Sequence, residues 1–258
     1  RLRGKLMHRN IVNMAHLGAR AFEEIGGEVV QTTAFVLSKR NVADFEATYV
    51  RLVDYNSQQA KEEAFLTGND RYTAKKENFE KIPGSPVAYW VSEKMCIAFD
   101  TGKLISKFAS ASEGIKTGNN DLFLKLWHEV EAPLVSFEDE PDRYKWVPHH
   151  KGGDYHKWYG NMEWVINWAN NGSEIKNSSN SGLQGKEMYF KPVICWSKIT
   201  SKGASFRYIR KNCLFDSGSP ACMPKSHLYY VMGFLNSIVC KQILVATNPT
   251  LNTQVGNI

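Results

Sequence analysis

The sequence predicts a mixed α/β fold, in which an α/β segment at the start is followed by a β-rich domain ending in an amphipathic helix. Near the N-terminus, apolar residues at helical spacing are followed directly by β-branched runs. Further on, short apolar segments alternate with glycine and asparagine turns, and a last apolar stripe has helical spacing. With 258 residues, 43% hydrophobic and 22% charged, the chain can form one large domain or two small ones.

The first segment predicts one helix and two strands. Over residues 10–25 the apolar residues lie at helical spacing, and a Gly26-Gly27 stop follows; they are Met14, Leu17, Ala21, Phe22 and Ile25. The β-branched stretches EVVQTTAFVL (28–37) and ATYVRLVDY (47–55) predict two strands that pair antiparallel. This order is typical of the edge of an α/β sheet.

A domain boundary is predicted between residues 80 and 81, so that the two domains are 1–80 and 81–258. The sequence is polar and charged from 56 to 81, and Pro83-Gly84 with Pro86 then prevents a helix. The second domain holds the short apolar segments VAYWVS, DLFLKLWHEV, EWVINW, MYFKPVICWS and SFRYIRKNCLF. NGSEIKNSSNSG (171–182) is expected to be a surface loop. The final helix is expected to place on one packing face Leu228, Val231, Met232, Leu235, Ile238, Val239 and Ile243.

The positive charge is unevenly distributed, although the formal net charge is only +6. Residues 188–215 contain six basic residues and no acidic one. The first acidic residue, Glu23, comes after Arg1, Arg3, Lys5, Arg9 and Arg20. Such local surpluses indicate polyanionic partners, and ordinary solvated surface lysines are the alternative.

The cysteines and the apolar runs predict a cytoplasmic protein without membrane contact. The five cysteines are odd in number, have no C-x-x-C spacing, and suit buried thiols better than disulfides or a zinc site. No signal-like apolar run follows the basic N-terminus, and polar residues interrupt the apolar region 228–246. Because the chain starts at Arg1 and ends in NPTLNTQVGNI, we expect a piece of a longer protein.

The stretch KWVPHHKGGDYHKWYGN (145–161) permits two kinds of site. A metal-hydrolase hypothesis would use His149, His150, Asp154 and His156. In extended backbone the two adjacent histidines point to opposite sides, and neither a cysteine nor an H-x-x-x-H spacing is present. We therefore expect no metal here and treat the histidines as bystanders.

The nucleic-acid interpretation of the same stretch fits its composition better. Its lysines can contact phosphates, and Gly152-Gly153 lets the backbone approach a ligand closely. Its aromatic residues offer flat surfaces for bases or serve as core anchors. We expect the tryptophans to point inward, so that a Trp158→Ala substitution mainly destabilises the protein, while the lysines face DNA.

Two further stretches have a composition suited to phosphate contacts. EGIKTGNNDLF (113–123) is either a phosphate-holding turn or a plain turn, with Asn119-Asn120 at positive φ or capping a helix. SKITSKGASFRYIRK (197–211) combines hydroxyls, basic residues and aromatics. The predicted DNA-binding residues are Lys116, Thr117, Asn119, Lys145, Lys151, Lys157, Tyr159, Asn161, Lys198, Ser201, Lys202, Arg207, Arg210 and Lys211. The sequence contains no G-x-x-x-x-G-K-[ST], G-x-S-x-G or H-E-x-x-H motif.

Six stretches, in order along nearly the whole chain, carry a resemblance to a known family: AHLGARAFEEIGGEVVQTTAFVL, KIPGSPVAYWVS, GIKTGNNDLFLKLWHEV, KWVPHHKGGDYHKWYGN, YFKPVICWSKITS and LNSIVCKQILVATNPTLNTQVGNI. They resemble the PglX family, adenine-specific DNA methyltransferases of BREX-type phage defence that are related to fused type II restriction-modification enzymes. The block 145–161 is the most specific part of the likeness.

The resemblance implies that residues 1–80 end a Rossmann-like methyltransferase domain and that 81–258 form a target-recognition domain. It implies S-adenosylmethionine as the cofactor of the whole protein, with double-stranded DNA and other defence-system subunits as partners. The glycine-rich cofactor loop and the Asn-Pro-Pro-Tyr motif are not in this chain, so no catalytic or cofactor-binding residue is assigned. We expect the segment alone to be inactive. A non-catalytic specificity subunit of a type I restriction system is the alternative.

Overall fold

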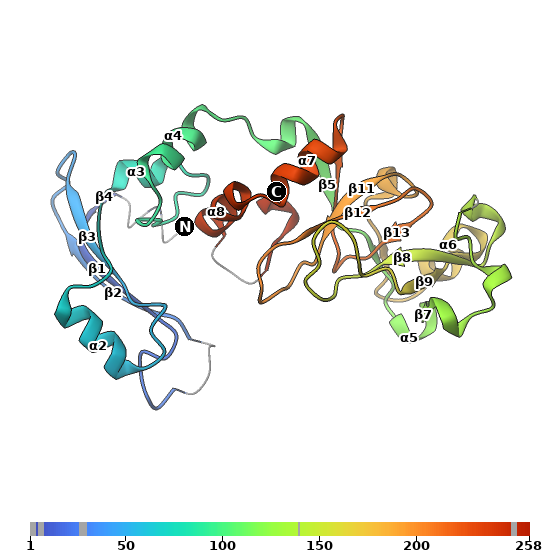
Figure 1. Cartoon of the computed structure of the whole chain (residues 1–258), viewed down its shortest axis with the longest axis horizontal. Helices are drawn as coiled ribbons and strands as arrows, with labels where there is room; N and C mark the ends of the chain where they lie inside the picture. Colours follow the sequence, from blue (N-terminus) through green and yellow to red (C-terminus); the bar gives the residue numbers. More distant parts are fainter. Residues whose placement is uncertain (1–3, 5–7, 26–29, 139, 249–251) are drawn as a thin grey trace. The chain divides into compact units, whose positions relative to one another are not determined.

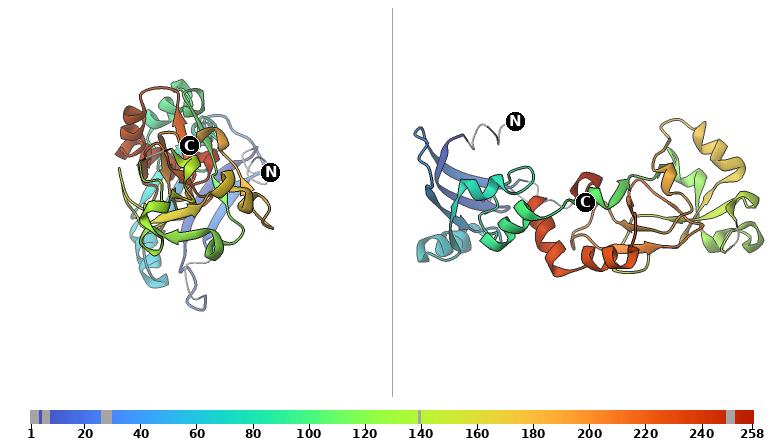
Figure 2. Two further views of the ribbon diagram at one scale, coloured as in Figure 1. Left: turned by 90° about the vertical axis from the view of Figure 1, so that its right-hand side faces the viewer. Right: turned by 90° about the horizontal axis from the view of Figure 1, so that it is seen from above.

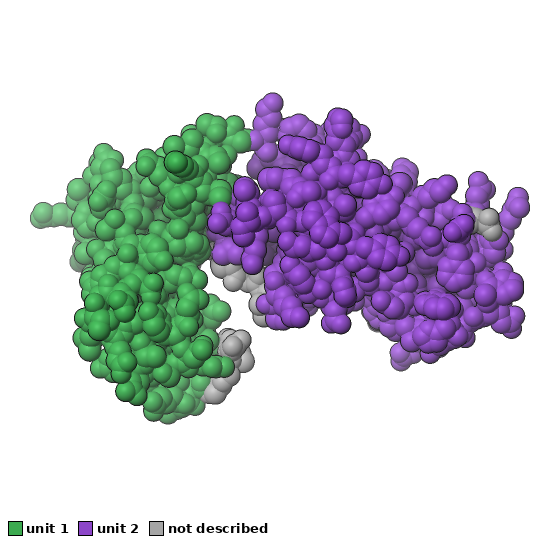
Figure 3. All heavy atoms as spheres, viewed as in Figure 1, with its two compact units in different colours: residues 1–102 green, residues 103–258 purple. Residues whose placement is uncertain are grey.

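The computed structural model of the chain describes residue 4 and residues 8–25, 30–138, 140–248 and 252–258. It divides into two compact units, unit 1 with residues 1–102 and unit 2 with residues 103–258 (Figure 3). Both contain helices and β-sheets, which confirms the predicted mixed α/β fold class.

Unit 1 is built on a four-stranded sheet. Its strands are β1 (Asn10–Gly18), β2 (Thr32–Ser38), β3 (Glu46–Arg51) and β4 (Arg71–Lys75), in the order β2-β1-β3-β4 (Figure 1). β1 runs parallel to β3 and antiparallel to β2, and β4 pairs antiparallel with β3. β1 therefore occupies an inner position with a partner on each side.

The helix predicted over residues 10–25 is wrong, because residues 10–18 form the strand β1. Met14 packs into a core on one face of the sheet, while Leu17 contacts a core on the other. A strand that is covered on both faces shows apolar residues at spacings that also fit a helix. The Gly26-Gly27 stop lies outside the described residues. The two predicted strands are confirmed as β2 and β3, but β1 lies between them, so their predicted pairing is wrong.

Helices cover both faces of this sheet (Figures 1 and 2). The helix α2 (Gln58–Thr67) packs Ala64 against Val50 and Leu52. It begins at the N-cap Ser57, whose side chain accepts a hydrogen bond from the Ala60 N–H, as N-cap residues commonly do. The short α3 (Lys76–Glu80) and the segment behind it cover the face of Tyr49. The helix α4 (Glu93–Thr101) ends the unit.

The predicted boundary between residues 80 and 81 falls inside unit 1. The polar stretch 56–81, expected to connect domains, instead forms α2, β4 and α3. Beyond it, Tyr89 stacks on Tyr49 with 4.8 Å between the ring centroids, and both belong to one core with Phe79. Residues 82–96 add a second apolar cluster around Ile82 and Cys96. The chain thus divides after Gly102, where these contacts end.

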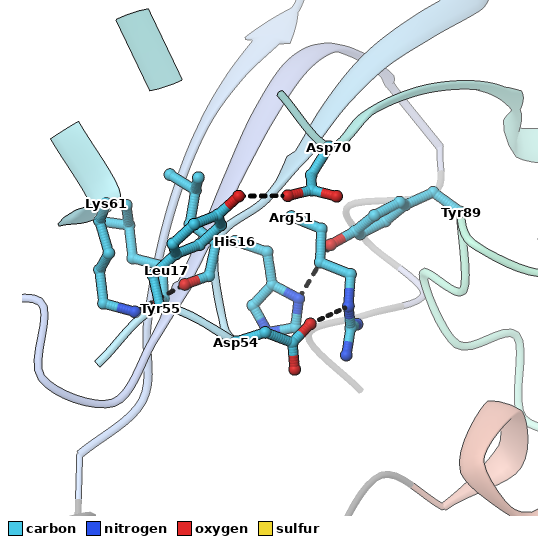
Figure 4. Close-up of polar contacts among 9 residues, drawn as sticks. His16, Leu17, Arg51, Asp54, Tyr55, Lys61, Asp70 and Tyr89 are labelled. Carbon is cyan, nitrogen blue, oxygen red and sulfur yellow. Dashed lines mark hydrogen bonds and ion pairs between the residues drawn. The ribbon is translucent and has the colours of Figure 1, made fainter. Parts of the chain in front are cut away.

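Among the described residues of unit 1, the buried lysine Lys61 has backbone carbonyls and no carboxylate as hydrogen-bond acceptors. The Lys61 ammonium donates to the carbonyls of Leu17 and Leu52 at 2.8 and 2.6 Å (Figure 4). Burial lowers the pKa of Lys61. In the same view His16 Nδ1 lies 3.1 Å from the Tyr89 hydroxyl. Burial, followed by the charge of Arg51, lowers the pKa of His16. Through its two hydrogen bonds, Lys61 joins α2 to the ends of β1 and β3.

Unit 2 contains three sheets, whose strands come from all parts of its sequence. An antiparallel sheet has the order β12-β11-β14-β5, and a mixed sheet has the order β13-β8-β9-β7. Their strands are β5 (Ala109–Ser112), β7 (Leu124–Leu126), β8 (Trp146–His150), β9 (Trp164–Asn167), β11 (Val193–Trp196), β12 (Phe206–Ile209), β13 (Leu214–Phe215) and β14 (Ala221–Pro224). A two-stranded sheet pairs β6 (Ile115–Lys116) with β10 (Gly182–Leu183).

The strand β11 lies at the centre of unit 2, because both of its faces are buried. Val193 and Cys195 point into a core shared with the β13-β8-β9-β7 sheet. Ile194 and Trp196 point the other way, into a core formed with α7 (Leu228–Leu235) and α8 (Ile238–Thr247). A continuous apolar run is typical of such a strand. The antiparallel sheet thus lies between two helices and a second sheet.

The remaining elements of unit 2 are short. They are α5 (Asn120–Phe123), α6 (Ala169–Lys176) and the 3₁₀ turns at Ile105–Lys107, Trp127–Glu129, Ala132–Leu134, Pro141–Arg143, Lys186–Met188 and Val255–Asn257. The predicted surface loop 171–182 is partly wrong, because α6 includes its first residues and buries Ile175. α6 starts irregularly, with Asn170, Asn171 and Gly172 at positive φ. All five cysteines are free and buried, as predicted.

The single final helix predicted from the apolar stripe is two helices. α7 ends at Leu235, and α8 begins after Ser237, whose hydroxyl accepts from the Cys240 N–H. Between them the Asn236 side chain bonds both backbone groups of Phe206, which holds the break against β12. The two helices are bent by 63° at this break. In the described part of the chain no single helix is long and apolar enough to cross a membrane, although α7 and α8 together reach that length.

Candidate nucleic-acid interface

Unit 2 carries most of the chain's excess positive charge. It has 18 lysines and arginines against 13 aspartates and glutamates, a net +5, whereas unit 1 has 14 against 13, a net +1. The imbalance increases toward the end, since residues 188–258 contain eight basic residues and one acidic residue, Asp216. The tract 188–215 is therefore part of a longer basic region in which Asp216 is the single acidic residue.

The loop 151–161, which follows β8, is attached to the antiparallel sheet at several points. The Ser197 hydroxyl donates to the Gly153 carbonyl at 3.0 Å and accepts from the Gly153 N–H at 3.2 Å. A Cβ on Gly152 would lie 2.6 Å from the Gly218 carbonyl oxygen. Gly152 thus permits a close approach to the chain's own backbone, whereas a Cβ on Gly153 would lie 3.3 Å from the Asn161 side chain. A close approach of this backbone to a ligand stays a prediction.

The second half of the loop pairs with the edge strand β12. The Trp158 N–H donates to the Phe206 carbonyl, and the Tyr208 N–H donates to the Trp158 carbonyl, both at 2.9 Å. Trp158 has φ 74°, a conformation that bulky residues adopt only where the surrounding structure enforces it. Asn161, at φ 58°, is buried, and its amide donates to the Asp154 carbonyl. The loop is thus held in one conformation.

The side chain of Trp158 is not a core anchor, which overturns the expectation from the sequence. It is 49% exposed, and Tyr159 is 66% exposed. Trp146 is buried as expected, at 8%. The difference arises because the backbone of Trp158 pairs with β12, which leaves its ring outside the core. Two aromatic rings in a rigid loop therefore face solvent.

Arg207 lies within the protein, so its predicted contact with DNA is wrong for this conformation. Its guanidinium donates to the Ser197 hydroxyl at 3.2 Å and to the His156 carbonyl at 3.5 Å, and its side chain is fully buried. Edge residues are buried when another segment pairs with the strand, as Trp158 does here. Arg207 therefore fixes the loop next to Lys157 and acts as a positioning residue.

The three lysines of the stretch 145–161 differ in their surroundings. Lys145 is exposed, with its ammonium 5.6 Å from the Trp146 ring centroid. The Lys151 ammonium lies over the Trp164 ring at 4.3 Å. Lys157 donates to the carbonyl of Asn236, the C-cap of α7, at 2.7 Å. Helix C-termini carry partial negative charge, which stabilises a cation there.

The turn 113–123 is organised by internal contacts. A Cβ on Gly114 would lie 2.1 Å from the Phe215 carbonyl oxygen, and the hydroxyl of the buried Thr117 donates to the Asn120 side chain. Asn119 has φ −150° and accepts a hydrogen bond from the Leu122 N–H as the N-cap of α5, so of the two predicted alternatives, positive φ or helix capping, the structure shows capping. Lys116 is exposed on β6. A phosphate contact in this turn stays a prediction.

The tract 197–211 presents part of its predicted set to solvent. Ser201, Lys202 and Lys211 are exposed. Lys198 is half-buried in an ion pair with Glu113, and Arg210 is half-buried beside Cys213. The structure thus leaves eight of the predicted DNA-binding residues exposed: Lys116, Asn119, Lys145, Lys157, Tyr159, Ser201, Lys202 and Lys211.

The adjacent histidines of β8 point into the protein on opposite sides of the strand. His149 Nε2 lies 3.7 Å from Asp216 Oδ2, and His150 Nδ1 lies 3.3 Å from Cys195 Sγ. Burial, reinforced by the charge of Arg207, lowers the pKa of His150 to about 3, so this imidazole is neutral at physiological pH. Within the described ranges, no three His, Cys, Asp or Glu side chains are grouped to hold a metal ion.

A pocket of about 80 Å³ brings together residues from three separate segments of unit 2. Lys157 comes from the loop, Lys202 from the turn between β11 and β12, and Lys241 from α8. Lys241 is not among the residues predicted from the sequence, because there it appears only as an interruption of the apolar region 228–246. The lack of acidic residues from 217 onward is the signal that could have identified it.

Known proteins resemble this chain along its full length. The sequence is 43% identical over its full length to the adenine-specific methyltransferase PglX of Lacticaseibacillus casei (strain Zhang). It is also 37% identical over its full length to the adenine-specific methyltransferase BrxX of Escherichia coli O9:H4 (strain HS). No protein-family model matches it.

The chain spans under a quarter of the length of the relatives it matches, 23% of PglX and 22% of BrxX. The likeness includes both units and the whole of the loop 151–161. The family resemblance that the six sequence stretches indicated is thereby confirmed.

Proposed function

We propose that this chain is the DNA-recognition segment of a site-specific adenine DNA methyltransferase of a phage-defence or restriction-modification system. The whole protein would transfer a methyl group from S-adenosylmethionine to adenine in DNA. The observation that carries the proposal is the full-length likeness to two proteins named adenine-specific methyltransferases. The net positive charge of unit 2, with a single acidic residue among residues 188–258, supports it, because phosphate backbones attract positive charge.

The two units would divide the work. Unit 1 would end the methyltransferase domain; its mixed sheet holds the parallel pair β1–β3 between two antiparallel pairs. Unit 2 would read the DNA. Its loop 151–161 is already held in one conformation, so little ordering would be needed on binding. Exposed lysines would contact phosphates, while Trp158 and Tyr159 offer rings to bases.

The residues described in unit 1 do not fit S-adenosylmethionine. Glycine-rich strand-to-helix connections commonly cradle such nucleotide cofactors. Here the connection from β3 to α2, residues 52–57, has no glycine, and β4 passes directly into α3. The cofactor is therefore assigned to the part of the longer relatives outside this segment, and the segment alone should not methylate DNA.

The type I specificity subunit is the less favoured alternative. Both relatives are named methyltransferases, and the segment matches them through unit 1 as well as unit 2. A pure binding subunit offers no reason for that match.

The test is binding of the chain to fluorescent duplex DNA at several salt concentrations. With about six phosphate contacts, log affinity against log salt should have a slope near −5. Lys151→Ala with Lys157→Ala should weaken binding without unfolding the chain. Lys176→Ala with Lys186→Ala removes the same charge from other exposed positions of unit 2 and is the control. Binding that is absent, or independent of salt, would contradict the proposal.

A further inference from the structure

From the pocket between the loop 151–161, the β11–β12 turn and α8, we infer that unit 2 holds one phosphate group of a DNA strand between Lys157, Lys202 and Lys241. We call this the lysine pocket. The inference rests on the proposed function and extends it, because it names a contact that fixes the position of the DNA backbone. It also assigns a role to Lys241, which no sequence motif indicated.

The residues that line the lysine pocket favour the binding of an anion. Its described residues include three lysines and no aspartate or glutamate. Three ammonium groups around one small space repel each other, and an anion between them replaces that repulsion with attraction. Hydroxyl groups of Tyr155, Thr200 and Ser237 also line it and can donate to phosphate oxygens.

The helix α8 adds its positive end to the same pocket. Ser237, the N-cap of this ten-residue helix, lines the pocket beside Lys241. Helix N-termini carry partial positive charge and donate free backbone N–H groups to phosphates. The break between α7 and α8, held by the bonds of Asn236 to Phe206, is what directs this helix end toward the lysines.

The size of the pocket selects the group that binds. Its volume of about 80 Å³ is several times the roughly 10–15 Å³ that one water molecule needs. It is far below the roughly 300–1,000 Å³ of pockets that enclose whole small molecules. A phosphate group of a polymer therefore fits better than a free nucleotide enclosed with its base.

The pocket is attached to the rigid part of the interface. Lys157 is held by the Asn236 carbonyl and follows His156, whose carbonyl accepts from the buried Arg207. The next residue is Trp158, with its exposed ring. A phosphate in the lysine pocket would therefore fix the strand next to that ring. This makes the pocket a positioning contact that applies to every DNA sequence.

The experiment uses two double variants. The pocket variant carries Lys202→Gln and Lys241→Gln, and the control variant carries Lys176→Gln and Lys186→Gln. All four lysines are exposed, so the folds should be preserved, and thermal unfolding checks this. Lys157 is left unchanged because it bonds Asn236. For duplex DNA, the pocket variant should lower the size of the salt slope by about 1, equally for all sequences, and the control should not. Equal slopes in the two variants would overturn the pocket.

A second measurement separates the pocket from the proposed function. In NMR spectra of the wild-type chain, inorganic phosphate should shift the backbone amides of 237–241, and the pocket variant should lose this shift. If phosphate shifts these amides but duplex DNA does not bind, the pocket stands and the proposed function fails. If DNA binds with a slope near −5 and phosphate leaves 237–241 unchanged, the function stands and the pocket fails.

Discussion

Units 1 and 2 each bury a cation in a similar way, and they differ in the side chains that they expose. Within the described part of the chain, each unit buries a cation whose hydrogen bonds go to uncharged oxygens, Lys61 to two carbonyls and Arg207 to hydroxyl and carbonyl oxygens. Outside, unit 1 is nearly neutral and exposes the apolar side chains of its edge strand β2. Unit 2 instead gathers lysines next to exposed aromatic rings. The buried cations fix the fold, so only exposed ones are free to meet a partner.

The largest expected effect tests the role of the buried cations. Arg207→Met should lower the free energy of unfolding by about 3 kcal/mol, because it removes the guanidinium that donates to the Ser197 hydroxyl and the His156 carbonyl. Lys61→Met should cost about 2 kcal/mol for the same reason in unit 1. Urea unfolding measures both. Only Arg207→Met should also weaken DNA binding, because it releases the loop 151–161. If both substitutions weakened DNA binding equally, the expected difference between the two units would be contradicted.

Acid should act on unit 2 through His150. Its pKa is lowered to about 3 in the folded state, against about 6.5 in the unfolded chain, so the unfolded state takes up the proton first. The stabilisation is complete above pH 6.5 and is lost as pH falls toward 3, which amounts to about 3 kcal/mol between pH 7 and 4.

Unfolding in urea at several pH values measures this loss, and His150→Gln should flatten the dependence. In the native protein the His150 ring protons should show no NMR titration between pH 8 and 5. A titration near pH 6.5 would contradict the buried placement.

The two tryptophans of one stretch should respond in opposite ways. Trp158→Ala should change the free energy of unfolding by less than about 1 kcal/mol, since its ring is half-exposed, and should weaken DNA binding by about 1 kcal/mol. Trp146→Ala should cost about 3 kcal/mol or more in stability, because its ring is buried. Thermal unfolding and DNA titration distinguish the two. Destabilisation by Trp158→Ala would restore the core-anchor interpretation.

The smallest effect concerns the exposed strand of unit 1. Val36 is 53% exposed on β2, so Val36→Lys should change stability by less than about 0.5 kcal/mol. It should nevertheless reduce self-association of the chain, because a charged residue on an edge strand opposes pairing with another strand. Light scattering against protein concentration measures this. Unchanged scattering would mean that the chain does not self-associate through β2.

Several features of the site could be predicted from residues alone. The uneven charge is a property of composition, and the unpaired spacing of the cysteines indicated buried thiols, which the structure confirms. The segment MYFKPVICWS was predicted as one of the short apolar segments of a β-rich domain, and it contains β11, which is covered on both faces. Asn119 was recognised as a cap, because capping depends only on the next three residues. These are local properties.

The tertiary structure decided what depends on partners distant in sequence. Residues 10–18 became a strand because two other strands flank them, and the final helix broke where Asn236 meets Phe206. Arg207 was buried and Trp158 exposed by one pairing between their segments. The lysine pocket joins residues 157, 202 and 241 in the same way. The sequence by itself determined which residue types are present and how they repeat. Only long-range packing chose which faces water, because burial depends on the neighbours that arrive from elsewhere in the chain.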